Sequence, residues 1–225
     1  MTDEPHQHQH STAQLAQQIL QDGMTRQFPS GRSLPLTERA QRILNQHLKY
    51  RVYHPALAQV PVEAARFMDA VLAEERPRWF SLLGPNGCGK TFTNKQICKL
   101  LAKWWRVPKY NGRHIPWIAH IQPAADLNDF KAAREYADAD LVFIEDICAG
   151  DVSEKGASAV VRSRVAELLQ LRSGKWTIFD ANLYRGQIAD MLDPRIASRM
   201  RRDDSVCIEI PANVPDFSDT PKQQN

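Results

Sequence analysis

The sequence has few cysteines, and they are irregularly spaced. Its 225 residues include only four cysteines, with no Cys-x-x-Cys pair among them. Zinc sites and disulfide frameworks need cysteines in close pairs or regular series, so neither is expected here. Free cysteines in this number are typical of the reducing cytoplasm, which is the location that we expect for the protein.

Long apolar runs are absent as well. No run approaches the roughly 18 apolar residues that cross a bilayer, and residues 1–14 lack the apolar core of a secretory signal. We therefore expect no membrane partner. Hydrophobic residues nevertheless make up 43% of the chain and recur in dense blocks. This composition excludes a fully disordered or collagen-like protein, and it suffices for a compact core.

Acidic residues are missing from one long stretch. Residues 76–125 contain no Asp or Glu but nine Lys or Arg, whereas residues 126–154 carry nine acidic residues against two basic ones. The net charge of +3 hides this segregation. A long stretch without negative charge is typical of a surface or site that receives a polyanion.

Short apolar runs alternate with helical patterns after about residue 60. Strands that alternate with helices predict a parallel sheet with helices on both faces. The fold class is therefore expected to be α/β, in three layers, with a five-stranded parallel sheet. Strands are expected at 79–83, 115–121, 141–144, 176–179 and 206–210, and helices at 62–75, 90–105, 124–137 and 155–172.

The chain divides into three expected parts. Residues 1–58 form an N-terminal extension, partly disordered, in which Thr37 is the expected N-cap of a helix at 37–50. This helix either docks a partner or packs on its own domain. Residues 59–212 form the main domain, and residues 213–225 a C-terminal tail.

One motif carries a specific chemistry. It fits G-x-x-x-x-G-K-[ST] at every defined position, after an expected strand and before an expected helix. Glycines let backbone N–H groups turn toward phosphates, and the helix N-terminus adds a favourable dipole. Lys90 is expected to neutralise the β- and γ-phosphates of ATP, and the Thr91 hydroxyl to bind Mg²⁺. The motif is Gly84-Pro85-Asn86-Gly87-Cys88-Gly89-Lys90-Thr91.

Two acidic residues follow the apolar run 141–144. Glu145 is expected to hold Mg²⁺, partly through water, and Asp146 to orient or activate the attacking water. A solvated acidic turn is the alternative interpretation. Asn182 follows the next apolar run and could contact the γ-phosphate or the water, although Asn after a strand commonly only makes a turn.

With these elements in order, the chain resembles the AAA+ ATPases of the DnaC/IstB-like group, which are bacterial and phage helicase loaders and transposition ATPases. The likeness organises residues 62–211. It implies a P-loop NTPase of the AAA+ type in which Asn182 is the sensor-1 residue. Four segments carry it: GPNGCGKT at 84–91, DLVFIED at 140–146, WTIFDANL at 176–183 and LDPRIASRMRR at 192–202.

The last of these segments matches the place where the family supplies an arginine to the ATP site of a neighbouring subunit. By position this arginine is Arg199, with Arg195 as a second candidate. A guanidinium at the γ-phosphate stabilises the charge that develops there, and this supports the role on physical grounds. The alternative is an ordinary solvated basic helix.

The chain departs from the family pattern in several places, among them a short stretch between the second and third expected strands, residues 122–140. Glu145 stands where Asp is usual, and Asp146 stands where Glu is common. Only about fifteen residues follow the last expected strand, too few for the helical lid of most AAA+ proteins. A reduced or absent lid agrees with the loader group.

A nucleic-acid surface is expected on the helix after the phosphate loop. Lys99 and Lys103 recur one turn apart, and Trp105 and Arg106 follow. Alternating cations and aromatic rings suit single-stranded DNA, whose phosphates need neutralising and whose bases can stack. In the alternative interpretation, the aromatic residues belong to the core and the lysines are ordinary surface residues.

The resemblance implies a helicase-loader-like protein of DNA replication, from a phage or mobile element. Such a protein binds and hydrolyses ATP with Mg²⁺ at composite sites between its own subunits. Its expected partners are a replicative helicase, or a transposase, and single-stranded DNA. The alternatives are an IstB-like transposition ATPase, a P-loop kinase of a small molecule and an ATP-dependent adaptor that does not hydrolyse.

Overall fold

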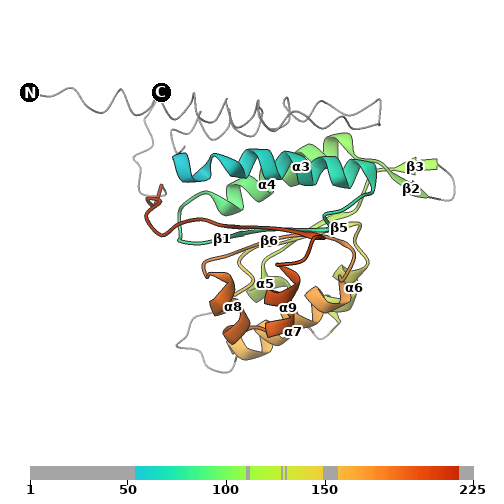
Figure 1. The fold of residues 1–225 in the computed structure, drawn as a ribbon. Coiled ribbons are helices and arrows are strands. Elements are labelled where there is room, and N and C mark those ends of the chain that lie inside the picture. The colour runs from blue at the N-terminus through green and yellow to red at the C-terminus, as the bar shows by residue number, and fades with distance from the viewer. Residues whose placement is uncertain (1–53, 110–111, 128, 130, 149–156, 218–225) are drawn as a thin grey trace, which may run out of the picture.

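A computed structural model gives the fold of the chain and describes residues 54–109, 112–127, 129, 131–148 and 157–217. The expected helix at 37–50 lies outside the described residues. Figure 1 shows a sheet with α3 and α4 on one face and α5 to α9 on the other. The three-layer α/β architecture expected from the sequence is therefore confirmed. The helices are α3 (Gln59–Ala73), α4 (Lys90–Trp104), α5 (Pro123–Asp126), α6 (Ala132–Ala137), α7 (Ala157–Leu171), α8 (Arg185–Met191) and α9 (Pro194–Arg199), after a short 3₁₀ helix at Pro55–Leu57.

The main sheet is parallel and has five strands in the order β4-β5-β6-β1-β7. The predicted five-stranded parallel sheet is therefore confirmed. In this order β1, which leads into the phosphate loop, lies between β6 and β7, and β6 separates it from β5. The strands are β1 (Trp79–Leu83), β4 (Ile118–Ile121), β5 (Leu141–Ile144), β6 (Trp176–Ala181) and β7 (Ser205–Glu209).

Apolar side chains alternate between two cores, one on each face of the sheet. Phe80 on β1 and Ile178 on β6 belong to the core under α3 and α4. Trp79 and Phe179 belong to the core under α7, where their rings meet edge to face at 5.6 Å. The central strands β1, β5 and β6 are buried along their whole length. Burial on both faces explains why these segments are continuous apolar runs rather than alternating ones.

Some predicted boundaries were wrong. The strand expected at 115–121 begins only at Ile118, because Pro116 has no N–H to give to a ladder and Ile115 is 71% exposed. Before it, an antiparallel hairpin, which the sequence did not predict, is formed by β2 (Val107–Lys109) and β3 (Gly112–His114). The helix expected at 124–137 is two short helices, α5 and α6.

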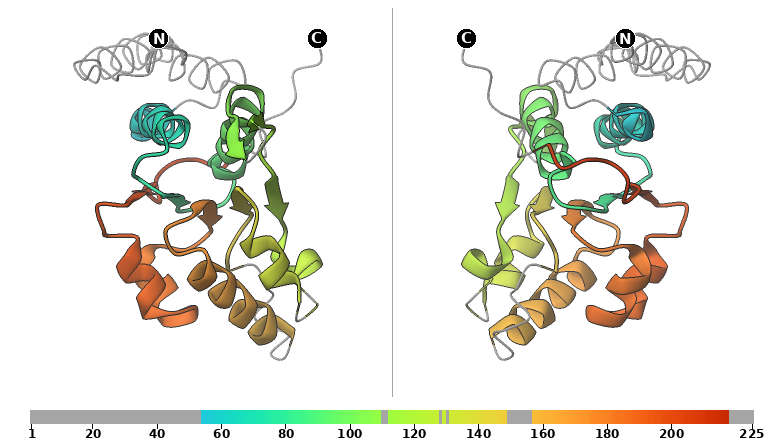
Figure 2. Two further views of the ribbon diagram at one scale, coloured as in Figure 1. Left: turned by 90° about the vertical axis from the view of Figure 1, so that its right-hand side faces the viewer. Right: turned by 90° about the vertical axis from the view of Figure 1, so that its left-hand side faces the viewer.

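None of the helices in the described part of the chain combines the length and the apolar character that a membrane crossing needs. The longest of them, α3, α4 and α7, each have 15 residues. They pack against the sheet, as the two end-on views of Figure 2 show.

The interior of the domain contains a basic side chain. Arg172, just after α7, is 0% exposed. Its guanidinium donates to the carbonyl oxygens of Ala139 at 2.7 Å and Ala137 at 3.1 Å, to that of Trp176, and to the Thr177 hydroxyl at 3.1 Å. Burial lowers the pKa of Arg172 to about 10, so the side chain still carries its charge at neutral pH. Arg172 thus ties the end of α6 to the start of β6.

Candidate nucleotide-binding site

The phosphate loop joins β1 to α4 at the carboxyl edge of the sheet. Gly84 and Gly87 adopt left-handed backbone angles, with φ of +135° and +68°. A Cβ at Gly84 would lie 2.5 Å from the carbonyl oxygen of Ile210, and a Cβ at Gly87 would lie 1.6 Å from a carboxylate oxygen of Asp216. Gly84 therefore requires glycine for conformation and for space, because the atom it would meet belongs to the backbone, whereas at Gly87 the left-handed conformation is the reason for glycine, since the Asp216 side chain can move. Gly89, also left-handed, caps α4, so the helix begins at Lys90.

Lys90 lies folded over the loop and is 5% exposed. Its ammonium group donates to the carbonyl oxygens of Gly84 at 3.1 Å and Pro85 at 2.5 Å, and to Oδ1 of Asn182 at 2.9 Å. Three donors of one ammonium are thus directed at the loop and at the end of β6. This places a fixed positive charge where the motif predicts contact with phosphates.

Asn182 continues this row of polar groups to the acidic end of β5. Its Nδ2 donates to Oδ2 of Asp146 at 2.7 Å. Asp146 itself has a left-handed φ of +48°, which turns the chain away from the strand direction. Lys90, Asn182 and Asp146, all candidate site residues from the sequence, come from three separate parts of the chain, and the structure brings them together.

Glu145 has different neighbours. Its Oε2 lies 2.8 Å from Nε2 of His120, on the edge strand β4, and 3.1 Å from the ammonium of Lys95 on α4. The His120 ring stacks on Phe143 with centroids 4.7 Å apart. Partial burial acts to raise the pKa of Glu145, but the hydrogen bonds from Lys95 and His120 outweigh it and hold the pKa below its ordinary value. Glu145 is therefore an ionised, charge-balanced group at the side of the site.

Asp180 is a site residue that the sequence did not single out. It ends the apolar run of β6, within the segment WTIFDANL, and is 1% exposed. Its carboxylate accepts from the N–H of Asp146 at 2.8 Å, from Nδ2 of Asn94 at 3.0 Å and from the side chain of Thr91. Burial raises the pKa of Asp180 to about 6, against the lowering effect of these hydrogen bonds. The available signal was a carboxylate placed inside an otherwise buried strand.

The oxygen atoms of this site fit a hard divalent cation. Thr91 supplies a hydroxyl, and Asp146 and Asp180 supply carboxylates, which are the donors that Mg²⁺ prefers. Two acceptors, Oδ1 of Asp146 and Oδ1 of Asn94, are buried without a hydrogen-bond partner among the described residues. That part of the chain holds no group of three or more His, Cys, Asp or Glu that would bind a metal alone. The donors therefore suit a cation that arrives with phosphates.

A cavity of about 840 Å³ opens between the phosphate loop, the acids and the end of the described chain. Phe217 donates its backbone N–H to the carbonyl oxygen of Gly87 at 3.1 Å, and Val214 is buried in the core under α3 and α4. Asp216 and Phe217, in the segment that the sequence assigned to a tail, therefore form one wall of the site. The cavity is lined by Asn86, Gly87, Gly89, Lys90, Thr91, Phe92, Glu145, Asp146, Asp180, Asn182, Asp216 and Phe217.

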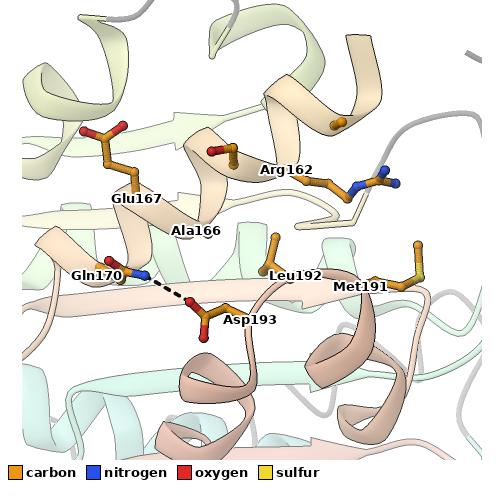
Figure 3. Close-up of a pocket in the computed structure, with 9 residues that line it drawn as sticks. Arg162, Ala166, Glu167, Gln170, Met191, Leu192 and Asp193 are labelled. Carbon is orange, nitrogen blue, oxygen red and sulfur yellow. Dashed lines mark hydrogen bonds between the residues drawn. The ribbon is translucent and has the colours of Figure 1, made fainter. Parts of the chain in front are cut away.

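A second cavity, of about 540 Å³, lies between α7 and the turn from α8 to α9 (Figure 3). Arg162 and Glu167 on α7 line it with opposite charges, and Gln170 donates to a carboxylate oxygen of Asp193 at 3.1 Å across one side. None of its lining residues belongs to the phosphate loop or to the acidic ends of the strands. The nucleotide chemistry predicted from the motifs therefore belongs to the larger cavity.

The two candidate arginines lie on α9, on the opposite face of the sheet from α4. Arg199 is half-buried: its guanidinium lies 5.9 Å from the centroid of the Trp79 ring and donates to the carbonyl oxygen of Leu169 at 3.4 Å. The Arg195 side chain is 79% exposed and pairs with Asp193 at 3.2 Å. Neither contact involves the chain's own phosphate loop.

The nucleic-acid surface expected on α4 is only partly present. Lys99 and Lys103 are exposed. The prediction that Trp105 lies on this surface was wrong. Its side chain is 3% exposed and packs in the core under α3 and α4, so its ring cannot stack on a nucleic-acid base. The Arg106 guanidinium makes hydrogen bonds within the chain instead. It donates to the carbonyl oxygens of Trp105 at 2.6 Å and Ala102 at 3.3 Å, at the C-terminal end of α4.

The chain has an α/β fold in which the loop between β1 and α4 lies at the carboxyl edge of a five-stranded parallel sheet. The structure is similar to the crystal structure of DnaI, with 20% sequence identity over 68% of this chain and 83% of the DnaI chain and a TM-score of 0.47. It is also similar to domain III of the replication initiation protein DnaA from Thermotoga maritima, with 15% identity over 72% of this chain and 65% of that chain and a TM-score of 0.47.

A further similar structure is AMPPCP-bound DnaA from Aquifex aeolicus, with 15% identity over 71% of this chain and a TM-score of 0.49. The match covers 48% of that DnaA chain, so this chain spans about half of its length. No protein-family model matches the sequence, and no curated protein sequence matches it. At these identities the similarity concerns the fold alone.

Proposed function

We propose that the protein is an ATP-dependent protein of DNA replication that acts in the manner of a helicase loader. It binds ATP with Mg²⁺ and hydrolyses it between subunits, and so controls how a replicative helicase engages single-stranded DNA. One observation carries the proposal: the row from Lys90 through Asn182 to Asp146 couples the phosphate loop to an acid on a separate strand. The resemblance of the segment at 192–202 to the loader group supports the replication role.

The chain's own groups divide the work in the proposed reaction. Backbone N–H groups of the loop and the Lys90 ammonium hold the phosphates. Asp146 accepts a proton from, or orients, the attacking water, and Asn182 fixes the Asp146 carboxylate in place. Mg²⁺ bound with the nucleotide neutralises charge on the phosphates. The cation would be held by Thr91 and by carboxylates at the ends of β5 and β6.

An arginine from a neighbouring subunit completes the site in this proposal. Arg195 and Arg199 lie away from the chain's own loop, so either one would act on a second copy. Exposure favours Arg195, because Arg199 would first have to leave Trp79 and Leu169. A guanidinium at the γ-phosphate accelerates transfer by orders of magnitude, which would make assembly a condition for hydrolysis.

The N-terminal extension, residues 1–58, is the proposed docking part for the helicase, and the contact is assigned to residues 37–50, where the sequence pattern predicts a helix. Deleting residues 1–53 should abolish capture of the purified helicase while ATP binding by the remaining domain is unchanged. Helicase binding that survives the deletion would contradict this role. A transposase tested in the same way distinguishes the loader from its transposition relative.

A second candidate function is an ATP-dependent adaptor that does not hydrolyse. The observation in its favour is that Glu145 is engaged by Lys95 and His120, so one of the two expected acids is not available to the reaction. Such an adaptor would bind ATP and assemble, with the nucleotide left intact.

The test is ATP turnover per subunit over a series of protein concentrations, with and without single-stranded DNA. A rate per subunit that rises with concentration supports composite sites and the loader proposal. A flat rate that ignores DNA would contradict it and favour a self-contained kinase-like site. ATP binding without turnover would favour the adaptor. Lys90→Ala, which removes the ammonium from the loop, gives the background rate.

A further inference from the structure

The two arginines of α9 differ in how the chain holds them. The Arg195 side chain is 79% exposed. Arg199 is half-buried, donates to the carbonyl oxygen of Leu169 and lies beside the Trp79 ring. An arginine that acts on a second copy of the chain has to present its guanidinium to solvent in a fixed direction. A long exposed side chain has many rotamers, and ordering it on contact costs free energy.

The Asp193 carboxylate holds the exposed guanidinium from one side. Its Oδ1 accepts from Nε of Arg195 at 3.3 Å, and its Oδ2 lies 3.2 Å from Nη2. This pairing uses one edge of the guanidinium and leaves both hydrogens of Nη1 outside it. Hydrogen bonds from the backbone N–H and the side chain of Arg195 hold the pKa of Asp193 below its ordinary value, so the carboxylate is ionised at neutral pH. Arg195 can therefore contact Asp193 and a phosphate at the same time.

The carboxylate itself is fixed from two elements. Asp193 is 9% exposed, and its Oδ1 also accepts the backbone N–H of Arg195 at 2.7 Å, as the N-cap of α9. Its other oxygen accepts from Nε2 of Gln170 on α7 at 3.1 Å, the hydrogen bond drawn in Figure 3. A buried anion that is anchored in this way can hold an exposed cation in one direction.

We propose that Asp193 is the positioning residue of Arg195: it holds the Nε and Nη2 edge of the guanidinium and presents Nη1 to the γ-phosphate of ATP bound in a second copy of the chain. This inference rests on the proposed function, because that function takes an arginine from a neighbouring subunit. Arg195, rather than Arg199, then crosses the interface, and Gln170 ties it to α7. Asp193 itself touches no phosphate.

Asp193→Asn separates the positioning of Arg195 from the capping of α9. Asparagine caps a helix as well as aspartate does, so α9 should fold, but the amide loses the charge and one of the two acceptor atoms. ATP turnover of the assembled protein should fall by about tenfold or more, because a small misplacement of a catalytic group is costly. The dissociation constant of a fluorescent ATP analogue should stay within a few fold. Turnover equal to that of the unchanged protein would overturn the inference.

The matched control is Asp190→Asn, the same change on α8, at an exposed residue that lines neither cavity. It should leave turnover and affinity unchanged.

Mixed assemblies show whether the loss lies in the arginine that a subunit supplies or in its own phosphate loop. Asp193→Asn should gain turnover when it is mixed with Lys90→Ala, whose arginine is intact. It should gain none with Arg195→Ala, which lacks the same part. A gain with Arg195→Ala, or none with Lys90→Ala, would mean that Asp193 acts on its own subunit and would overturn the inference.

Gln170→Met tests the same connection without touching α9. The new side chain has a similar shape and no donor for Asp193, so turnover should fall by roughly threefold, as for the loss of one neutral hydrogen bond. Circular dichroism and thermal unfolding show whether each variant is folded. If Asp193→Asn is not folded, Gln170→Met decides the question, and unchanged turnover of this variant would then overturn the inference.

Two results separate a failure of this inference from a failure of the proposed function. If turnover per subunit of the unchanged protein does not rise with protein concentration, no arginine crosses between subunits, and both are wrong. If it rises and Arg195→Ala keeps the unchanged rate, the composite site stands, and only the assignment of Arg195 and Asp193 is wrong.

Discussion

Asn182 is the middle group of the polar row in the nucleotide site. It accepts from Lys90 at 2.9 Å and donates to Asp146 at 2.7 Å, so one amide sets the distance between the loop and the acid. Asn182→Ala should reduce ATP turnover by about 100-fold, because preorganised polar groups of this kind contribute that much to transition-state stabilisation. Affinity for ATP should change by only a few fold. Steady-state turnover and equilibrium binding of an ATP analogue check the two parts.

The matched control for this change is Asn213→Ala, an exposed asparagine that does not line the cavity. It should leave both values unchanged. Equal turnover of Asn182→Ala and the unchanged protein would show that the amide only completes a turn after β6, the plainer interpretation that the sequence allowed.

Arg172 is expected to be the residue on which folding depends most. Its guanidinium donates to carbonyl oxygens around Ala137, Ala139 and Trp176, all in the interior. Arg172→Met removes these donors and leaves buried carbonyls unsatisfied, so the free energy of unfolding should fall by roughly 3–5 kcal/mol. Arg172→Lys should not restore it, since one ammonium cannot match a planar guanidinium. Urea unfolding followed by circular dichroism measures the loss.

Lys131→Met is the control for Arg172, because Lys131 is exposed and its replacement should change stability by less than about 0.5 kcal/mol. A comparable loss in both variants would mean that the buried hydrogen bonds of Arg172 contribute nothing specific.

At the residue scale, the sequence did not reveal the role of a single polar residue inside an apolar segment. The motifs identified Lys90, Asp146 and Asn182, since each belongs to a pattern with a known chemical reason. Asp180 carries no such pattern. Its contacts with Thr91 and Asn94 arise from the packing of β6 against α4, and its contact with the backbone of Asp146 arises because β5 is the neighbour of β6.

The segment at residues 211–217 brings two side chains, Asp216 and Phe217, to the nucleotide cavity. Its Asp216 lies against Gly87 of the phosphate loop and lines the cavity. A carboxylate there repels the phosphates of ATP, so Asp216→Asn should tighten binding by roughly fivefold, or about 1 kcal/mol for one charge near the surface. Isothermal titration with ATP at two salt concentrations measures the effect, which should shrink as salt screens the charge.

Asp190→Asn on α8 is the control for net charge, because Asp190 is exposed and does not line the cavity. Similar tightening in both variants would indicate a general charge effect. Weaker binding by Asp216→Asn would instead show that the carboxylate contacts the nucleotide favourably.

The exposed lysines of α4 are the remaining part of the predicted nucleic-acid surface. Lys99→Ala with Lys103→Ala should weaken binding of single-stranded DNA and lower the slope of log affinity against log salt by about 1.4, for two lost phosphate contacts. Fluorescence anisotropy of a labelled oligonucleotide at several salt concentrations gives both values. Unchanged binding, with Lys131→Ala as the control, would remove α4 from the DNA interface.

At the scale of elements, burial decided which predictions succeeded. The strands β1, β5 and β6 are buried on both faces, so their apolar runs were plain in the sequence. The hairpin of β2 and β3 has three residues in each strand and no such run, and it was missed. Trp105 was assigned to the surface because its neighbours are basic, whereas packing under α3 places it in the core.

At the scale of the whole molecule, strand order determines which residues can share a site. With β6 between β1 and β5, the loop meets residues from both β6 and β5 at one edge of the sheet. The sequence predicted five parallel strands but contained no signal for their order. It could therefore name the acids after β5 and the amide after β6, but it could not rank them by distance from the loop.

The position of α9 has a consequence for assembly. Arg195 is exposed, and α9 lies on the face of the sheet opposite α4, so a second subunit is required for this arginine to meet a phosphate loop. In such an arrangement each interface takes its loop from one subunit and its arginine from the next. Defects in these two parts can then complement each other in mixed assemblies.

Lys90→Ala and Arg195→Ala, each inactive alone, should therefore regain activity when mixed. In an equal mixture about a quarter of the interfaces pair an intact loop with an intact arginine, and turnover should approach about a quarter of the unchanged rate. Circular dichroism of each variant first checks that Lys90→Ala, which loses a buried side chain, is folded. A mixture no more active than the sum of its parts would show that each subunit hydrolyses ATP alone. The same mixture with Arg199→Ala tests the other arginine, and recovery with only one of the two variants identifies the residue that crosses the interface.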